Sequence, residues 1–178
     1  MTARPGRPIT IQVRTRWAAE RDLYMVTMEL RDRLLVTLTN PQAFNYAADV
    51  SGVVSQALHD AGLIGKLLAS GRPRATALLA ANKARKVEHK AMTGPVLLTS
   101  GVDPNTLHPF IGLSVGTTVG RWTVQEADGH ARDVLIAAGL ADRQTDSRAA
   151  LIGMGMPDFQ ATNAVNDLDN YRQKYLGR

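Results

Sequence analysis

Residues 34–62, LLVTLTNPQAFNYAADVSGVVSQALHDAG, decide the fold that we expect, because a strand pattern changes into a capped helix within them. Alternate positions up to Leu38 are apolar, as in a half-buried strand. Thr39 and Gln42 then have the spacing of a capping box, which predicts the start of a helix. We expect Gly62 to end this helix. Its expected apolar stripe consists of Phe44, Ala47, Val50, Val54, Ala57, Leu58 and Ala61.

Two further alternating runs precede this stretch, from Ile9 to Trp17 and from Tyr24 to Leu30. Together with the run that ends at Leu38 they predict a three-stranded antiparallel meander. The connection between the second and third strands lacks the glycine that favours tight hairpin turns. The sequence therefore predicts the hairpin more firmly than its register.

The rest of the chain repeats this mixture of strands and amphipathic helices. Residues 96–99 and 110–115 predict a second pair of strands. Thr123 and Glu126 form another capping box before an apolar stripe that Gly139 is expected to end. The expected class is α+β: an antiparallel sheet, made of the meander and the second strand pair, covered by about five amphipathic helices. These helices are expected at residues 39–62, 75–92, 123–139, 146–154 and from 158 onward.

A weak internal similarity suggests a ββα pseudo-repeat. Residues 38–63 align without gaps on residues 115–140 with five identities, among them Gly52 with Gly129. Chance or shared helix geometry explains so few identities better than duplication does. Both glycines fall inside expected helices, where glycine costs about 1 kcal/mol relative to alanine. We therefore expect close helix packing at both positions.

Composition indicates an ordinary globular protein. The chain has 178 residues, of which 44% are hydrophobic and 21% are charged, and no cysteine, so disulfides and thiolate metal sites are excluded. The amino terminus lacks the apolar core of a secretory signal, and no apolar run approaches the length of a membrane span. We expect a flexible basic arm at residues 1–8, followed by one cytoplasmic α+β domain at residues 9–178. Its halves would be residues 9–92 and 93–178.

Positive charge is concentrated in the amino-terminal half. Residues 1–90 carry a net charge of +7 and residues 91–178 carry −2. On the expected helix at 75–92, Lys83, Lys86 and Lys90 would share one face. Such cations can neutralise phosphates and release counterions. The expected nucleic-acid-binding residues are Arg4, Arg7, Arg14, Arg16, Arg72, Arg74, Lys83, Arg85, Lys86 and Lys90.

Other motifs carry weaker functional signals. Residues 147–165 resemble a helix-turn-helix only in the spacing of two small residues, and acids on the second helix would repel DNA. The glycine-rich passage at residues 112–121 lacks the spacing of a phosphate-binding loop and predicts a turn.

Two groups of polar residues could carry chemistry. Glu126, His130 and Asp133 could share a helix face and hold a metal or act as acid and base, although surface ion pairs are the commoner arrangement. Ser100, Asp103 and His108 lie too close together in one loop to resemble a hydrolytic triad.

The sequence thus favours a non-enzymatic binding protein whose basic amino-terminal surface contacts an anionic macromolecule, with nucleic acid as the preferred class. No catalytic residue, metal site or cofactor is assigned. The alternative is a homo-oligomeric interaction or assembly module that does not bind nucleic acid. A small-molecule enzyme is the third hypothesis.

Overall fold

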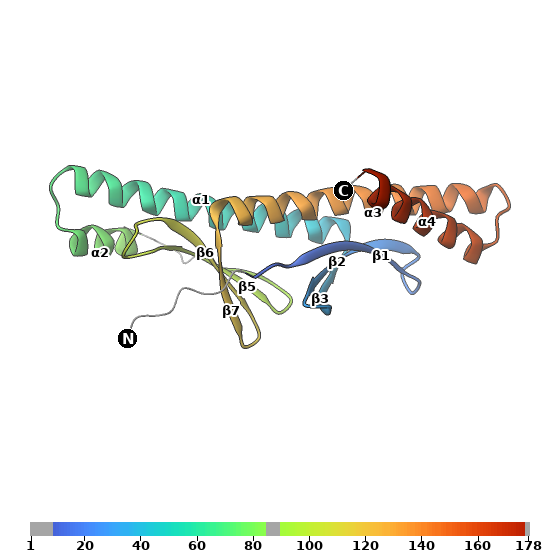
Figure 1. The fold of residues 1–178 in the computed structure, drawn as a ribbon, viewed down its shortest axis with the longest axis horizontal. Helices are drawn as coiled ribbons and strands as arrows, with labels where there is room; N and C mark the ends of the chain where they lie inside the picture. Colours follow the sequence, from blue (N-terminus) through green and yellow to red (C-terminus); the bar gives the residue numbers. More distant parts are fainter. Residues whose placement is uncertain (1–8, 85–89, 177–178) are drawn as a thin grey trace.

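The computed structural model describes residues 9–84 and 90–176, and these residues have the expected α+β fold (Figure 1). The described part contains four α-helices rather than about five, because residues 124–153 form one helix instead of two. The elements are β1 (Gln12–Ala18), β2 (Leu23–Leu30), β3 (Arg33–Leu38), α1 (Asn40–Ala69), α2 (Arg74–Ala84), β4 (Lys90–Thr93), β5 (Val96–Val102), β6 (Pro109–Val115), β7 (Thr118–Thr123), α3 (Val124–Gly153) and α4 (Asp158–Leu176).

The strands form two antiparallel sheets, so the expectation of a single sheet is wrong. The first has the order β1-β2-β3, so the predicted meander is confirmed. Its β2–β3 turn places Arg31 and Asp32 in the left-handed region, at φ of 51° and 62°, so the turn forms without glycine. The second sheet has the order β4-β5-β6-β7 and therefore contains two strands more than the predicted pair. In it, Gly116 at φ 58° occupies the predicted turn in the glycine-rich passage.

Both long helices begin at their predicted caps and continue past their predicted ends. The Thr39 amide donates to Gln42 Oε1 at 2.9 Å. At the second helix the Thr123 amide donates to the Glu126 carboxylate at 2.7 Å, and the Glu126 amide donates to the Thr123 hydroxyl at 3.1 Å. The expected stops at Gly62 and Gly139 are wrong. Burial beyond each glycine, for example that of Ile64, outweighs the modest cost of a glycine in a helix.

The prediction of a helix at residues 75–92 is also wrong in its second half. α2 ends at Ala84, and Lys90 begins β4, which pairs with β5. Ala91 and Met92 pair with Leu98 and Leu97 of β5. This strand pairing outweighs the helical pattern of the local sequence. The i, i+3, i+7 spacing of the three lysines is therefore not realised on a helix.

The expected apolar stripe of α1 is correct in part: Ala47, Val50, Val54 and Ala57 are buried as predicted. Phe44 and Leu58 are about half exposed, at 51% and 49%, whereas Tyr46 and Val53 are buried. The buried positions of α1 are Ala43, Tyr46, Ala47, Val50, Val53, Val54, Ala57, Asp60 and Ile64.

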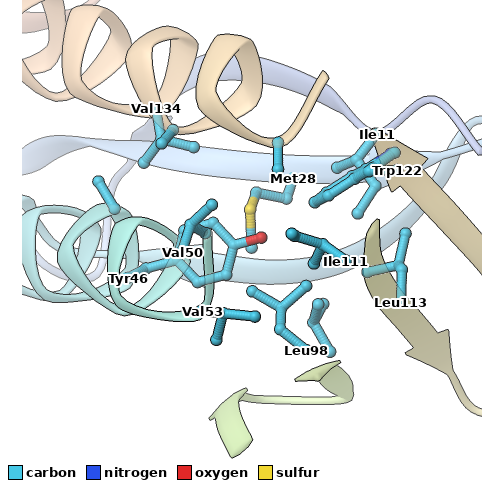
Figure 2. Packing of buried hydrophobic residues seen from close by; sticks show 14 of the residues in the cluster. Ile11, Met28, Tyr46, Val50, Val53, Leu98, Ile111, Leu113, Trp122 and Val134 are labelled. Atoms are coloured by element: carbon cyan, nitrogen blue, oxygen red, sulfur yellow. The ribbon is translucent and has the colours of Figure 1, made fainter. Parts of the chain in front are cut away.

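In space, α1 and α3 lie side by side along the long axis, and both sheets lie on the same side of this pair (Figure 1). The sheets are exchanged between the halves: the first sheet packs mainly against α3, and the second packs mainly against α1. Figure 2 shows the main core that results, where Met28 of β2 meets residues of α1, α3 and the second sheet. No helix in the described part combines the length and apolar character that crossing a bilayer requires.

Gly52 and Gly129 do not mark helix crossings, since a Cβ added at either position would meet nothing within 4 Å. The predicted pseudo-repeat is not confirmed: the alignment of residues 38–63 with residues 115–140 places Thr39, the N-cap of α1, opposite Gly116, whereas the N-cap of α3 is Thr123.

Candidate binding surfaces

The predicted cations whose side chains the structure describes lie in two separate places. Arg14 and Arg16 extend from the exposed face of β1, whereas Arg72, Arg74 and Lys83 surround α2 near one end of the molecule (Figure 1). β1 lies on the other side of the second sheet along the long axis. Of the remaining predicted cations, Arg4, Arg7, Arg85 and Lys86 lie outside the described residues, and Lys90 is described only by its backbone in β4.

A smaller group of exposed cations remains at the α2 end, which we call the basic end: Lys66, Arg72, Arg74 and Lys83. Lys66 was missed by sequence reasoning because it falls in the part of α1 beyond Gly62, which was expected to be loop. Ile64 and Ala77 hold α1 and α2 together here, with Leu107 of the β5–β6 loop packed against them. Arg74 also donates to the backbone carbonyl of Asn105.

The basic end carries uncompensated charge. Within the part of the chain that the structure describes, no carboxylate lies within ion-pair distance of its four cations. Some cations elsewhere are paired, since Arg16 lies 3.4 Å from Glu29 and Arg121 lies 3.3 Å from Asp103, whereas Arg14, among the described residues, bonds only the side chain of Gln12. Counting charges by halves of the sequence did not reveal that these four cations lie at the same end of the fold.

A pocket of about 220 Å³ lies at the first turns of α3. His130 and Trp122 line it together with Ile9, Thr10 and Ile11, and the exposed carboxylates Glu126 and Asp133 complete the lining with Gly129. The Trp122 indole N–H donates to the Ile9 carbonyl at 2.6 Å and thereby holds the segment before β1 against the second sheet.

His130 is buried against the partner helix. Its Nε2 lies 3.0 Å from the hydroxyl of Tyr46, and its ring lies 4.8 Å from that of Trp122. Burial lowers the pKa of His130 to about 4 and raises the pKa of Tyr46 above its ordinary value. Both side chains are therefore neutral at pH 7.

The expected grouping of Glu126, His130 and Asp133 on one helix face is present, since all three line this pocket. Glu126 also accepts the Thr123 amide as part of the helix cap. The described residues contain no group of three histidine or carboxylate side chains arranged for a metal ion. The metal interpretation therefore receives no support from the geometry.

Ser100 lies in β5, opposite Ile111, and only Asp103 and His108 lie in the β5–β6 loop, which forms a turn. The carboxylate of Asp103 accepts the amides of Thr106 and Asn105, and these two hydrogen bonds lower the pKa of Asp103. The same carboxylate also forms an ion pair with Arg121, so its contacts serve to hold the loop in place. Residues 147–165 form the end of α3, a turn and the start of α4, and not a separate pair of short helices.

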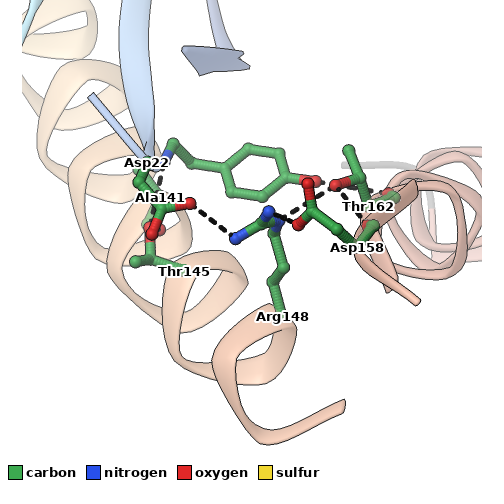
Figure 3. Close-up of polar contacts among 7 residues, drawn as sticks. Asp22, Ala141, Thr145, Arg148, Asp158 and Thr162 are labelled. Atoms are coloured by element: carbon green, nitrogen blue, oxygen red, sulfur yellow. Dashed lines mark hydrogen bonds and ion pairs between the residues drawn. The ribbon is translucent and has the colours of Figure 1, made fainter. Parts of the chain in front are cut away.

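At the far end of α3, an arginine that sequence reasoning missed joins three elements (Figure 3). The buried guanidinium of Arg148 lies 2.8 Å from Asp22, donates to Thr162 at 2.9 Å and pairs with Asp158. It also lies 3.8 Å from the ring centroid of Trp17. No local pattern announces this contact, because Asp22 precedes Arg148 by 126 residues.

Comparison with protein-family models, with curated proteins and with solved structures finds no match for this chain. Function is therefore inferred from two surfaces of the molecule. One is the basic end around α2, and the other is the pocket beside His130.

Proposed function

We propose that this chain is a non-enzymatic protein that binds an anionic macromolecule through its basic end, with nucleic acid as the preferred class. One observation carries the proposal: residues 61–102 contain seven Lys and Arg but a single acid, Glu88. This segment has a net charge of +6 and the whole chain has +5, so all other residues together carry −1.

The composition of the basic end favours contact with phosphates over contact with bases. Residues 61–102 contain no Phe, Trp or Tyr on which bases could stack. Exposed lysine and arginine without carboxylate partners can neutralise backbone phosphates, and the release of counterions makes such binding strongly salt-dependent. We therefore expect binding that is insensitive to base sequence. Arg14 and Arg16 lie apart from this surface and are not included in it.

Charge reversal at two places tests the proposal. The variant Arg72→Glu/Lys83→Glu changes the basic end, and Arg14→Glu/Arg33→Glu makes the same change in net charge on the first sheet. Fluorescence anisotropy with a short labelled DNA duplex, at about 50 and about 200 mM salt, should show a large loss of affinity for the first variant and a small loss for the second. Equal losses, or no binding by the unaltered protein at low salt, would refute the proposal.

Exposed apolar side chains favour a second candidate function, the assembly module. Met154 and Phe159, at the turn between α3 and α4, are each 75% exposed, and Leu168 is 61% exposed. A self-association surface would bury such groups. Light scattering distinguishes the two functions, since a stable oligomer without affinity for DNA supports assembly, and a monomer that binds DNA supports the first proposal.

We also infer an internal duplication, with an offset of 84 residues. Thr39 and Thr123 cap helices of 30 residues each, and every buried position of α1 recurs as a buried position of α3 at this offset. Each helix is followed by a glycine with positive φ, Gly71 and Gly155. Nine residues are identical between residues 39–73 and 123–157.

The same offset extends beyond the long helices. It relates β1 to β5 and the start of α2 to the start of α4. Tyr46 and His130 are equivalent residues and contact each other, as expected at a pseudo-twofold axis. The two ends of the molecule are then equivalent in fold but different in chemistry. Ile64 packs in an apolar cluster at the basic end, whereas Arg148, its equivalent at the opposite end of the molecule, is paired with carboxylates.

A further inference from the structure

The pocket beside His130 is acidic, although the protein as a whole is basic. Its lining contains two carboxylates, Glu126 and Asp133, and no lysine or arginine. These two residues are seven positions apart on α3, so they lie on one line of the helix about 10 Å from each other along its axis. A group held between them would meet the Asp133 carboxylate at one end and, at the other, the Glu126 carboxylate, one oxygen of which accepts the Thr123 amide.

Gly129 opens the space between the two carboxylates. This glycine lies inside a helix, where it costs about 1 kcal/mol relative to alanine, and its φ is not positive. Helix packing does not require it either, because a Cβ at this position would contact nothing within 4 Å. What the missing side chain does leave is room in the lining of the pocket.

The other walls suit a positively charged organic group. His130 is only 7% exposed and neutral, so it does not repel a cation. The Nε2 atom of His130 is hydrogen-bonded to the Tyr46 hydroxyl, and the Nδ1 atom of His130 has no hydrogen-bond partner among the residues that the structure describes. Trp122 is 4% exposed and also lines the pocket, and an indole is the aromatic group that attracts cations most strongly; Ile9 and Ile11 add apolar contact.

We propose that this pocket binds a small organic cation, an alkylammonium or alkylguanidinium group. Its volume of about 220 Å³ exceeds the roughly 150 Å³ of a cavity that holds benzene, so a chain of four or so carbons with its charged head fits. Such a group occurs both in free amines and in the lysine and arginine side chains of peptides. This site lies on α3, away from the basic end, and its proposal does not depend on nucleic-acid binding.

The binding test uses the full chain and four probes: butylammonium, butylguanidinium, butanol and butyrate. Chemical-shift titration of the Gly129 and His130 amides should show saturable binding of at least one cation and none of the neutral or anionic isosteres. Two further arms, free 1,4-diaminobutane and a blocked lysine or arginine amide, separate the two sources of the group. Absence of binding by both butyl cations, or equal binding of butanol, would overturn the proposal.

Substitutions separate a ligand site from a structural role. Asp133→Asn should weaken cation binding by roughly fivefold, since one partly exposed charge pair is lost. Gly129→Leu should abolish binding, whereas Gly52→Leu, in an equally open helix position of α1, should leave it unchanged. Gly129→Ala should raise the melting temperature yet reduce affinity, a combination that a purely structural glycine would not produce. Unchanged affinity in Asp133→Asn and Gly129→Ala would contradict the proposal.

Discussion

Expressing each half of the chain alone tests the exchanged packing of sheets and helices. In residues 9–84 the first sheet would keep α1 and α2 but lose α3, against which it mainly packs. Its buried side chains Val26, Met28 and Tyr24 would then face water, and so would Tyr46 and Val50 on the side of α1 that contacts α3. We expect neither half to fold by itself.

The burial free energy that one half would lose is as large as the free energy of unfolding of a whole domain. Five buried side chains at about 1.5–3 kcal/mol each give roughly 8–15 kcal/mol. The free energy of unfolding of a typical domain is about 5–15 kcal/mol, so the loss removes the margin for folding.

Circular dichroism and proton NMR spectra of residues 9–84 and 93–176 provide the assay. Each fragment alone should show low helicity and no cooperative thermal transition. An equimolar mixture should regain both, because each sheet then finds the helix of the other half. A dispersed spectrum and a cooperative transition from one isolated fragment would refute the exchanged packing.

Three other predictions concern stability. The pKa of His130 is about 4 in the folded state and near 6.5 in the unfolded state, so the unfolded state takes up a proton first as the pH falls. The free energy of unfolding should therefore fall by about 3 kcal/mol between pH 6.5 and pH 4. Urea titrations should show this fall in the unaltered protein and a smaller fall in the variant His130→Phe. Arg148→Ala should lower stability by about 2–4 kcal/mol through loss of a charge-assisted network and its packing on Trp17, and Arg148→Met should recover part of that loss in the same titration. Gly62→Ala and Gly139→Ala should each raise stability by about 1 kcal/mol, since both positions are open mid-helix sites, and a decrease in the melting temperature would contradict the account of why these glycines do not end their helices.

Local chemistry made the starts of the helices predictable. The capping boxes at Thr39 and Thr123 depend on residues three positions apart, so the sequence alone located them. The strands of the first sheet were equally predictable, because apolar residues alternate along their sequence, and in β1 the exposure of the side chains alternates as well. The ends of the helices were not predictable, since α1 continues past Gly62 to bury Ile64 against α2, a contact that the pattern within α1 does not reveal.

The candidate sites depended on contacts that sequence patterns do not carry. Lys90 left the expected helix because β4 pairs with β5, and that pairing separates it from Lys83. Tyr46 and Val53 proved buried where Phe44 and Leu58 were expected, since α1 contacts both a sheet and α3, which widens its buried face. The grouping of Glu126 with His130 was accessible from helical spacing alone, but the pocket around it required Trp122 from β7.

The central claim is that polyanions contact the basic end around α2 and not the face of the first sheet. Amide chemical-shift mapping of the full chain with a short DNA duplex at low salt tests it most directly. We predict perturbations confined to the last turns of α1, the following turn and α2, at residues 62–84. Perturbations centred on β1 and β3, or none at any amide, would contradict the claim.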